Sequence, residues 1–179
     1  MSVPTVQSIP SAIPSDGTVA LWWVKTIANP SAPKVTELTG AATVPLQCYL
    51  KEMFTPNVEA ETVTDRRMCS KQVFEDVGTR TYTIEELIGI YSPQDPTGTT
   101  ESGKAYAALA PDATGFLVAR WGIDLEGTDR APKAGQFVDV YPVKIATRRK
   151  LPQEANSQLK FGARPRVRGP VVEDVALVA

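Results

Sequence analysis

The chain has 179 residues, and its 19 basic and 20 acidic residues leave a formal net charge of −1 at pH 7. A chain of this length forms one domain with a sizeable core, and its charge gives no whole-chain attraction to nucleic acid or to an anionic membrane. It contains no histidine. Most hydrolase and zinc mechanisms are thereby excluded, because histidine is the usual general base and the commonest metal ligand near neutral pH.

The N-terminal stretch MSVPTVQSIPSAIPSDG is rich in proline and serine. This composition predicts a flexible arm over residues 1–17, followed by a single domain over residues 18–179. The stretch lacks the positive start and apolar block of a signal peptide, so export by that route is not expected. Its apolar residues, among them Val3, Ile9 and Ile13, are expected to anchor the arm against a neighbouring copy of the chain.

Residues 18–27 form an apolar run with two adjacent tryptophans, Trp22 and Trp23, and their composition favours a strand. Side chains alternate along a strand, so the two indoles point to opposite faces. One is expected in the core, and the other is expected to be covered by the proline-containing segment that follows or by a neighbouring copy. Residues 34–39 predict one helical turn closed by Gly40.

Further strands are predicted over residues 43–50 and 60–68, and the clearest alternation lies in residues 79–92. There one long strand is predicted, with a core face and a wet face. The core face comprises Tyr82, Ile84, Ile88 and Ile90, with Glu86 as a single polar intruder. The wet face carries Thr81, Thr83 and Glu85.

Residues 101–109 predict a helix behind several threonine and serine N-cap candidates. Strands are predicted again over residues 115–123, 136–148, 158–163 and 171–178, and the loop over residues 124–135 suits an exposed hairpin tip. Strands and long helices do not alternate, which argues against a doubly wound sheet. The predicted fold is mainly β, an antiparallel β-sandwich or barrel with one flanking α-helix and an extended N-terminal arm.

The sequence holds no convincing catalytic, metal or cofactor site. Cys48 and Cys69 are not in a zinc-binding spacing and are expected to be reduced, buried thiols. The adjacent Glu85 and Glu86 face opposite sides of a strand and cannot flank one substrate atom. Residues 124, 126 and 129 are acidic, but they lack the remaining ligands of a calcium loop and predict an ordinary turn. We therefore expect no enzyme activity, no metal and no cofactor.

The C-terminal third carries an unusual charge distribution. Between residues 144 and 168 there are eight bases and one acid, whereas residues 51–126 hold thirteen acids and seven bases. The basic region includes Arg148, Arg149, Arg164, Arg166 and Arg168. It has three interpretations: a nucleic-acid patch, a solvated strand edge, or one side of a head-to-tail contact with the acidic region of the next copy.

The order of these features resembles the major tail tube proteins of long, non-contractile-tailed bacteriophages. The resemblance covers nearly the whole chain beyond the first seventeen residues. Its most specific parts are the pattern N-P-x-x-P-x-V-x-E-L after the first strand and the strands G-F-L-V-A-R-x-G and A-G-Q-x-V-D-V-Y-P-V. No catalytic signature contributes to it.

The resemblance implies a structural virion protein whose subunits form hexameric rings. These rings stack into a tube around a tape-measure protein, meet tail-terminator and baseplate proteins, and later pass DNA without binding it specifically. The expected location is the virion tail, after assembly in the host cytoplasm. We expect Thr81, Thr83 and Glu85 to face the lumen, and Val3, Ile9, Ile13 and the five arginines to lie at subunit interfaces. A tail-terminator or head-tail connector of related fold is the alternative.

Overall fold

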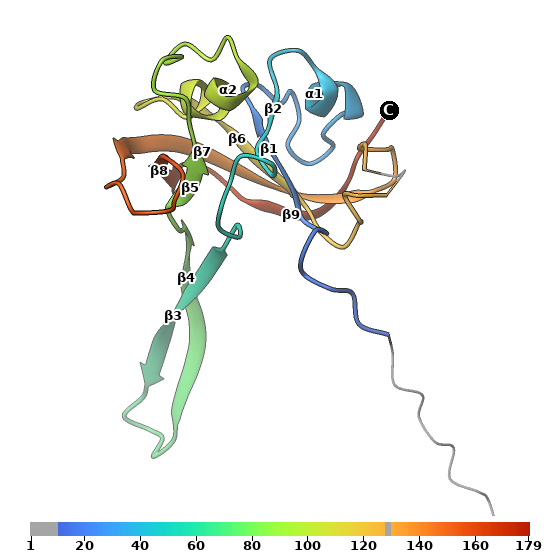
Figure 1. The fold of residues 1–179 in the computed structure, drawn as a ribbon. Coiled ribbons are helices and arrows are strands. Elements are labelled where there is room, and N and C mark those ends of the chain that lie inside the picture. The colour runs from blue at the N-terminus through green and yellow to red at the C-terminus, as the bar shows by residue number, and fades with distance from the viewer. Residues whose placement is uncertain (1–10, 128–129) are drawn as a thin grey trace, which may run out of the picture.

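The computed structural model describes residues 11–127 and 130–179 (Figure 1). The described residues form nine strands and two helices. In chain order these are β1 (Ala20–Val24), α1 (Val35–Thr39), β2 (Val44–Pro45), β3 (Pro56–Arg66), β4 (Val73–Ile84), β5 (Leu87–Ile90), α2 (Glu101–Ala108), β6 (Thr114–Arg120), β7 (Phe137–Lys150), β8 (Lys160–Val167) and β9 (Val172–Ala176).

Seven of these strands form one curled antiparallel sheet in the order β2-β1-β6-β7-β8-β5, with β9 also paired to β7. The 14-residue strand β7 pairs with β6 on one side and with β9 and then β8 on the other. Its register shifts against β8 and β9 are irregularities of the kind that increase local twist, which helps the sheet to curl. The predicted mainly β, antiparallel fold is confirmed as a half-barrel.

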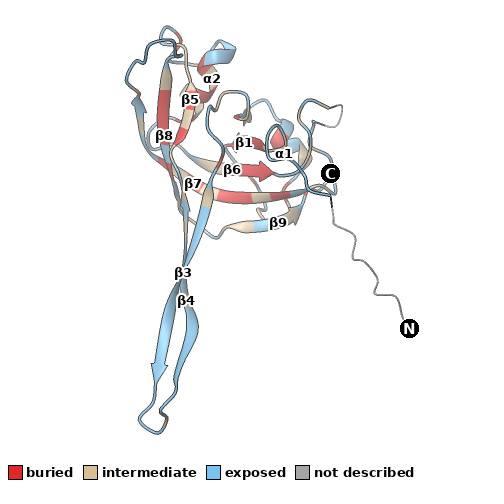
Figure 2. Ribbon diagram, turned by 60° about the horizontal axis from the view of Figure 1, so that its bottom comes forward, coloured by how far each residue is buried: buried red, intermediate tan, exposed pale blue. Residues whose placement is uncertain are grey.

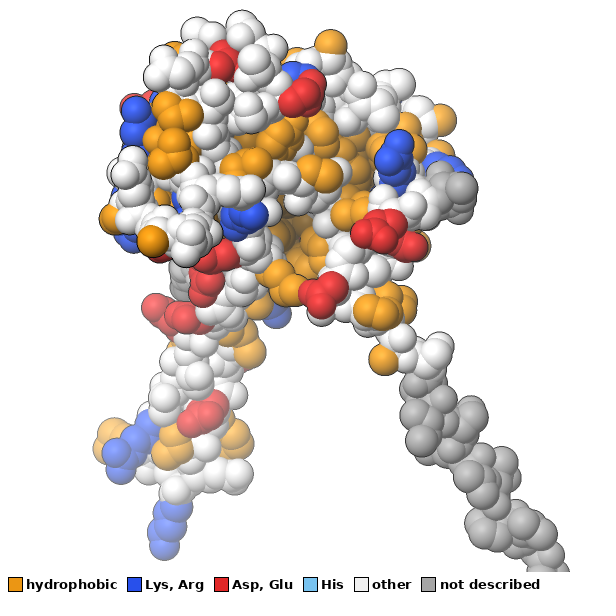
Figure 3. Space-filling model, in the orientation of Figure 1, with side chains coloured by type: hydrophobic (Ala, Val, Ile, Leu, Met, Phe, Trp, Pro, Cys, Tyr) orange, Lys and Arg blue, Asp and Glu red, His pale blue; other side chains and the backbone are white. Residues whose placement is uncertain are grey.

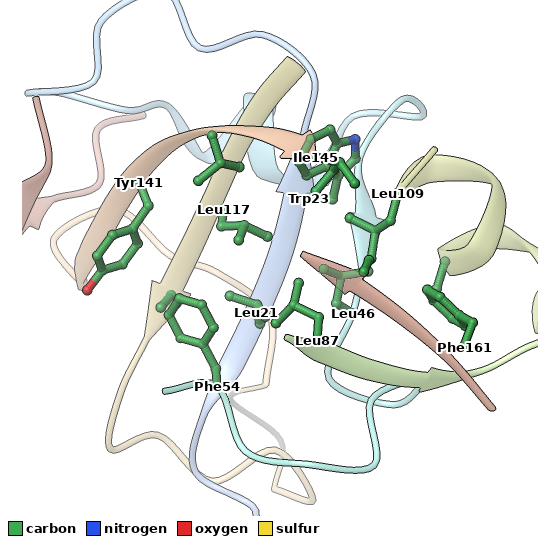
Figure 4. Close-up of a cluster of buried hydrophobic side chains, with 14 residues drawn as sticks. Leu21, Trp23, Leu46, Phe54, Leu87, Leu109, Leu117, Tyr141, Ile145 and Phe161 are labelled. Atoms are coloured by element: carbon green, nitrogen blue, oxygen red, sulfur yellow. The ribbon is translucent and has the colours of Figure 1, made fainter. Parts of the chain in front are cut away.

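Two hydrophobic clusters lie on opposite faces of β1. Trp23 belongs to the larger cluster, which Figure 4 shows with side chains from β1, β5, β6, β7, β8 and the connecting loops. Trp22 belongs to the smaller cluster, with Leu38 of α1 and Leu177 near the C-terminus. The guanidinium carbon of Arg120 lies 5.4 Å from the Trp22 ring centroid. Both indoles are buried within one subunit, so the segment after β1 supplies the expected cover and no neighbouring copy is needed.

The two helices agree with the sequence. α1 is the expected single turn, and Gly40 follows it. The side chain of Glu37 accepts hydrogen bonds from the backbone N–H groups of Ala28 and Lys34, which fastens this turn to the chain leaving β1. α2 spans nearly the predicted range and has Thr100 as its N-cap residue.

The predicted single strand over residues 79–92 is wrong. The chain forms β4, which ends at Ile84, and β5, which begins at Leu87. The strand breaks between them, where Glu86 turns toward β7 and β8 and binds the guanidinium groups of Arg149 and Arg164.

The predicted core face of this region is wrong as well. In β5 the buried residues are Leu87 and Gly89, while Ile88 and Ile90 are half-buried. Tyr82 and Ile84 in β4 are also only half-buried. The strand breaks at positions 85 and 86, and β4 then pairs with β3 in the ribbon while β5 pairs with β8 in the main sheet, so one face does not continue from β4 into β5.

Two smaller predictions also fail. The strand expected over residues 43–50 is reduced to β2, because a turn follows in which the N–H groups of Tyr49 and Leu50 both donate to the carbonyl oxygen of Leu46. The thiols of Cys48 and Cys69 are free but exposed, not buried.

β3 and β4 form a separate two-stranded antiparallel ribbon (Figure 2). It projects away from the curled sheet, and nearly all of its residues are exposed. Helix α2 lies at the opposite end of the subunit in both Figure 1 and Figure 2. The sheet therefore lies between an exposed ribbon at one end and helix α2 at the other.

Candidate functional site

The β3–β4 ribbon is the most unusual surface of the subunit. Its 11-residue and 12-residue strands pair from Pro56–Ile84 at the root to Arg66–Val73 near the tip. Six of its larger apolar side chains are exposed: Val58, Val63, Met68, Val73, Phe74 and Val77. A two-stranded ribbon is marginally stable in water unless it packs on something else. This exposed ribbon therefore has the character of an interaction element.

The root half of the ribbon has two different faces. Cross-strand pairs and the alternation of side chains place Pro56, Val58, Ala60, Tyr82 and Ile84 on one side, together with one charged residue, Arg80, opposite Ala60; we call this side the apolar face. The other side carries Asn57, Glu59, Thr81 and Thr83, which we call the polar face. The register shifts between Ala60 and Thr62, so this division is defined for the root half.

The structure brings two of the predicted lumen residues together. Thr81 and Thr83 are exposed neighbours on the polar face, opposite Glu59 and Asn57 of β3. Glu85 lies just beyond the end of β4, is exposed, and donates its backbone N–H to the carbonyl oxygen of Thr55. The sequence missed that this wet surface belongs to a projecting ribbon. The signal was present in residues 60–68, where polar side chains occupy both faces of the strand.

The tip of the ribbon is basic and carries an exposed methionine. Arg66, Arg67 and Lys71 surround the fully exposed Met68. The side chain of Arg67 pairs with Asp65 at 2.9 Å. Figure 3 shows basic side chains gathered at this end of the ribbon.

At the root of the ribbon, Glu86 joins the start of β5 to β7 and β8. Its carboxylate accepts hydrogen bonds from Arg149 Nε and a second guanidinium nitrogen of Arg149, at 2.9 and 2.8 Å, and lies 3.7 Å from Arg164. Only 16% of the Glu86 side chain is exposed. The hydrogen bonds from Arg149 hold the pKa of Glu86 below its usual range, although burial opposes this shift.

The five arginines predicted at an interface have unequal surroundings. Arg149 and Arg164 bind Glu86, as described above. Arg148 stacks its guanidinium 3.7 Å from the Tyr106 ring centroid and donates a hydrogen bond to the Tyr106 carbonyl oxygen. Arg166 and Arg168 are exposed, and neither forms an ion pair within the described part of the chain. Three of the five therefore already have partners inside the subunit.

At the opposite end of the subunit, a buried carboxylate organises the start of α2. Asp95 accepts hydrogen bonds from the backbone N–H groups of Thr99 and Thr100 and from both hydroxyls. These bonds, those from Thr100 above all, hold the pKa of Asp95 well below its usual range. A Cβ added to Gly103 would lie 2.3 Å from Asp95 Oδ2. The start of α2 is therefore closely packed and hydrogen-bonded around Asp95.

A groove of about 520 Å³ lies between the N-terminal arm and the chain that enters the ribbon. One wall is formed by residues 13–19 and the other by residues 50–54, and Trp121 adds an aromatic surface. Figure 3 shows apolar side chains in the hollow between arm and ribbon. We call it the arm groove. Ile13, the one predicted arm anchor among the described residues, lines it; Val3 and Ile9 lie outside the described residues.

Neither a metal-binding cluster nor a membrane-spanning helix occurs among the described residues. Within residues 11–127 and 130–179, no three or more cysteine, aspartate or glutamate side chains come together in a way that would hold a metal ion. Asp124 accepts a hydrogen bond from the Glu126 backbone N–H, as in an ordinary turn, and Asp129 lies outside the described residues. No helix in the described residues has the length and apolar character needed to cross a membrane.

Comparison with known proteins identifies the family. The family model described as "Phage tail tube protein" matches residues 6–179. The chain belongs to the phage tail tube protein family. As a tail tube protein it is a structural component of the virion tail, and its family is not enzymatic. Among curated protein sequences none matches this chain.

A solved structure of the anti-feeding prophage (AFP) baseplate, 6-fold symmetrised, contains a chain similar to this tail tube protein. The TM-score is 0.44 and the sequence identity is 9%. The similarity covers 93% of the tail tube protein and 98% of the baseplate chain.

Proposed function

We propose that this subunit assembles with copies of itself into hexameric rings that stack head to tail as the tail tube of a long, non-contractile-tailed phage. DNA leaves through the lumen of this tube during ejection. Inside the virion the tube surrounds a tape-measure protein and ends at tail-terminator and baseplate proteins. Assembly takes place in the host cytoplasm. The number six and these partners come from the resemblance to the family.

The observation that carries the proposal is the exposed β3–β4 ribbon. Its apolar side chains are not covered by the subunit's own sheet, and a lone two-stranded ribbon is marginal in water. Packing against another copy removes these side chains from water and contributes roughly 25 cal/mol for each Å² of apolar surface buried. The ribbon is then stable in the assembly.

The direction of assembly follows from the two ends of the subunit. The ribbon projects at one end, and α2 with its Asp95 network occupies the other (Figures 1 and 2). A contact between two different surfaces is heterologous, so it generates closed rings or open stacks instead of a closed pair. Head-to-tail stacking of this kind produces a tube with a defined polarity.

The polar face of the ribbon suits a wall past which DNA slides. Lysine and arginine contacts to phosphates make binding strong and independent of sequence. Thr81, Thr83 and the nearby Glu85 and Glu59 offer hydroxyls and carboxylates instead of such cations. We propose that this polar face lines the lumen and that the apolar face packs against protein.

Electron microscopy of the purified full-length chain tests this function. The wild-type protein is expected to form stacked rings or tubes in negative stain. The double variant Val58→Thr/Val77→Thr keeps two good strand formers but weakens apolar packing in every subunit, so it is expected to remain as unassembled subunits with an unchanged melting temperature. Leu159→Thr, an exposed apolar position outside the ribbon, is the matched control.

Three results contradict the proposal. Single wild-type rings that never stack would support a tail terminator or connector instead. Wild-type subunits that stay monomeric at high concentration would contradict the proposal that the chain self-assembles. Tubes formed equally well by the ribbon variant and by the control would show that the ribbon does not make the contact.

A further inference from the structure

We propose that the arm groove binds the N-terminal arm of a neighbouring copy through the dipeptides Val3–Pro4 and Ile9–Pro10. This inference rests on the proposed function, because the tube is what brings a second copy within reach. It adds to that function a specific second contact, separate from the ribbon, in which each subunit's arm ties it to the next.

The lining of the groove suits a proline-containing apolar peptide. Phe54 and Trp121 lie side by side with ring centroids 6.2 Å apart and ring planes inclined at 31°. Leu21, Leu50 and Met53 add aliphatic surface. Met53 and Trp121 are exposed to solvent. Aromatic-lined grooves of this kind recognise extended proline-rich segments, because such segments lose little conformational entropy on binding.

The arm itself indicates which segment fits. Its sequence repeats one dipeptide type, an aliphatic residue followed by proline, at Val3–Pro4, Ile9–Pro10 and Ile13–Pro14. The third of these already lines the groove, where Ile13 Cδ1 lies 3.5 Å from the position a Cβ would take on Gly122. Residues 1–10 contain no charged side chain, so their uptake by this mainly apolar groove, which Asp16, Lys51 and Glu52 also line, buries no charged side chain of the arm.

The length and stiffness of the arm favour a neighbouring copy over the same copy. Residues before proline are driven toward extended conformations. Pro10 and Pro14 bias Ile9 and Ile13 toward extended backbone, which disfavours a turn that would fold Ile9 onto the groove that Ile13 already lines. Ten residues in a polyproline-type conformation span about 31 Å, so an extended arm reaches well beyond its own groove.

Peptide binding to the full-length subunit tests the groove. The probe is the synthetic peptide SVPTVQSIP, residues 2–10, titrated into dilute, unassembled protein while tryptophan fluorescence is recorded. A saturable change is expected, because Trp121 lines the groove while Trp22 and Trp23 are buried. The change should disappear in Trp121→Phe. The peptide with Val3→Ser and Ile9→Ser should bind at least about tenfold more weakly, since two aliphatic side chains no longer fill the groove.

A groove variant and its control complete the test. Met53→Glu places a charge at the groove and should weaken peptide binding, whereas Leu159→Glu, at an exposed site elsewhere, should not. No saturable change up to about 1 mM peptide, or equal binding by Met53→Glu and wild type, overturns the assignment.

Two further measurements complete the test. The first distinguishes binding of a neighbouring copy's arm from binding of the subunit's own arm, and the second asks whether the arm contact contributes to assembly. In dilute subunits, a small quencher should reach Trp121 equally in wild type and in Val3→Ser/Ile9→Ser; protection in wild type alone means that the arm fills its own groove and overturns the proposal. In negative-stain images, Val3→Ser/Ile9→Ser should form fewer or shorter stacks than the control Thr5→Ser/Gln7→Ser. Stacks of equal number and length would overturn the proposal. If wild type binds the peptide but never assembles, the proposed function fails while the groove's specificity for this segment is supported.

Discussion

Replacing Glu86 with glutamine is expected to destabilise the subunit at the root of the ribbon. The wild-type carboxylate accepts two hydrogen bonds from Arg149, at 2.9 and 2.8 Å, and lies close to Arg164. Glutamine keeps one acceptor oxygen but no charge, so the two guanidinium groups repel each other without a counter-ion between them. The strands that hold the ribbon in place then lose their ionic connection.

The magnitude lies between that of an exposed and a buried ion pair. Exposed pairs contribute about 0 to 1 kcal/mol, and breaking a fully buried pair costs about 3 to 5 kcal/mol. The Glu86 side chain is 16% exposed but that of Arg149 is 57% exposed, so solvent screens one partner. We expect the free energy of unfolding to fall by about 2 kcal/mol, which lowers the melting temperature by roughly 4 to 8 °C in a chain of this size.

The effect also depends on pH in a defined direction. The pKa of Glu86 is lowered in the folded subunit, so its stabilisation is present above the unfolded-state pKa of about 4.3 and is lost as the pH falls through the folded-state pKa. The difference in unfolding free energy between wild type and Glu86→Gln should be largest near neutral pH and should shrink in acid.

Urea denaturation of dissociated subunits at several pH values measures this difference. Glu154→Gln is the control, because Glu154 pairs with Lys160 on an exposed surface. The reasoning is refuted if Glu86→Gln and Glu154→Gln lower the unfolding free energy equally, or if the effect of Glu86→Gln is the same in acid as at neutral pH.

Three other changes test separate parts of the subunit. Gly103→Ala should lower the melting temperature, because its Cβ would lie 2.3 Å from Asp95 Oδ2; thermal denaturation followed by circular dichroism measures this. Arg166→Glu/Arg168→Glu should block assembly seen in negative stain while leaving the circular dichroism spectrum unchanged, because these two arginines have no partner among the described residues. In assembled tubes lacking the native cysteines, Thr83→Cys should react with a small thiol reagent but resist a bulky one if the polar face lines the lumen.

Each of these changes has a control. Ser102→Ala, on the exposed side of the start of α2, should leave the melting temperature nearly unchanged, and an equal drop would rule out the proposed clash at Gly103. If Arg166→Glu/Arg168→Glu formed normal tubes, these two side chains would not contribute to the contact between subunits. Labelling of Thr83→Cys by both reagents at the rate of an outer-surface cysteine would exclude the lumen assignment.

Local sequence signals predicted the parts of the fold that depend on local chemistry. The cap residues before α2 and the proline-bounded turn at α1 were sufficient to place both helices. Strand composition was sufficient to find β6 and β7 and to show that Trp22 and Trp23 face opposite ways. These features need few contacts distant in sequence.

The failures depend on contacts between distant segments. Glu86 ends a strand because Arg149 and Arg164, more than sixty residues later, lie beside it in the sheet, and no alternation pattern contains that information. The ribbon was missed for a similar reason. Its strands have the composition of ordinary strands, and only their lack of a covering layer shows that they project. Among the candidate site residues, sequence found the wet surface of Thr81 and Thr83 but not the arm groove, whose lining comes from three separate segments between Ile13 and Gly122.

The length of the ribbon turns small motions at its root into large ones at its tip. The 11 residues of β3 extend about 35 Å at roughly 3.3 Å per residue. A rotation of about 10° at the root therefore moves the tip by about 6 Å, which exceeds the 4.0 to 4.5 Å range of an apolar contact. The ribbon acts as a lever with its fulcrum beside Glu86. In the proposed assembly, the accuracy with which one subunit meets the next therefore depends on the root of the ribbon, far from the surface where the two would touch.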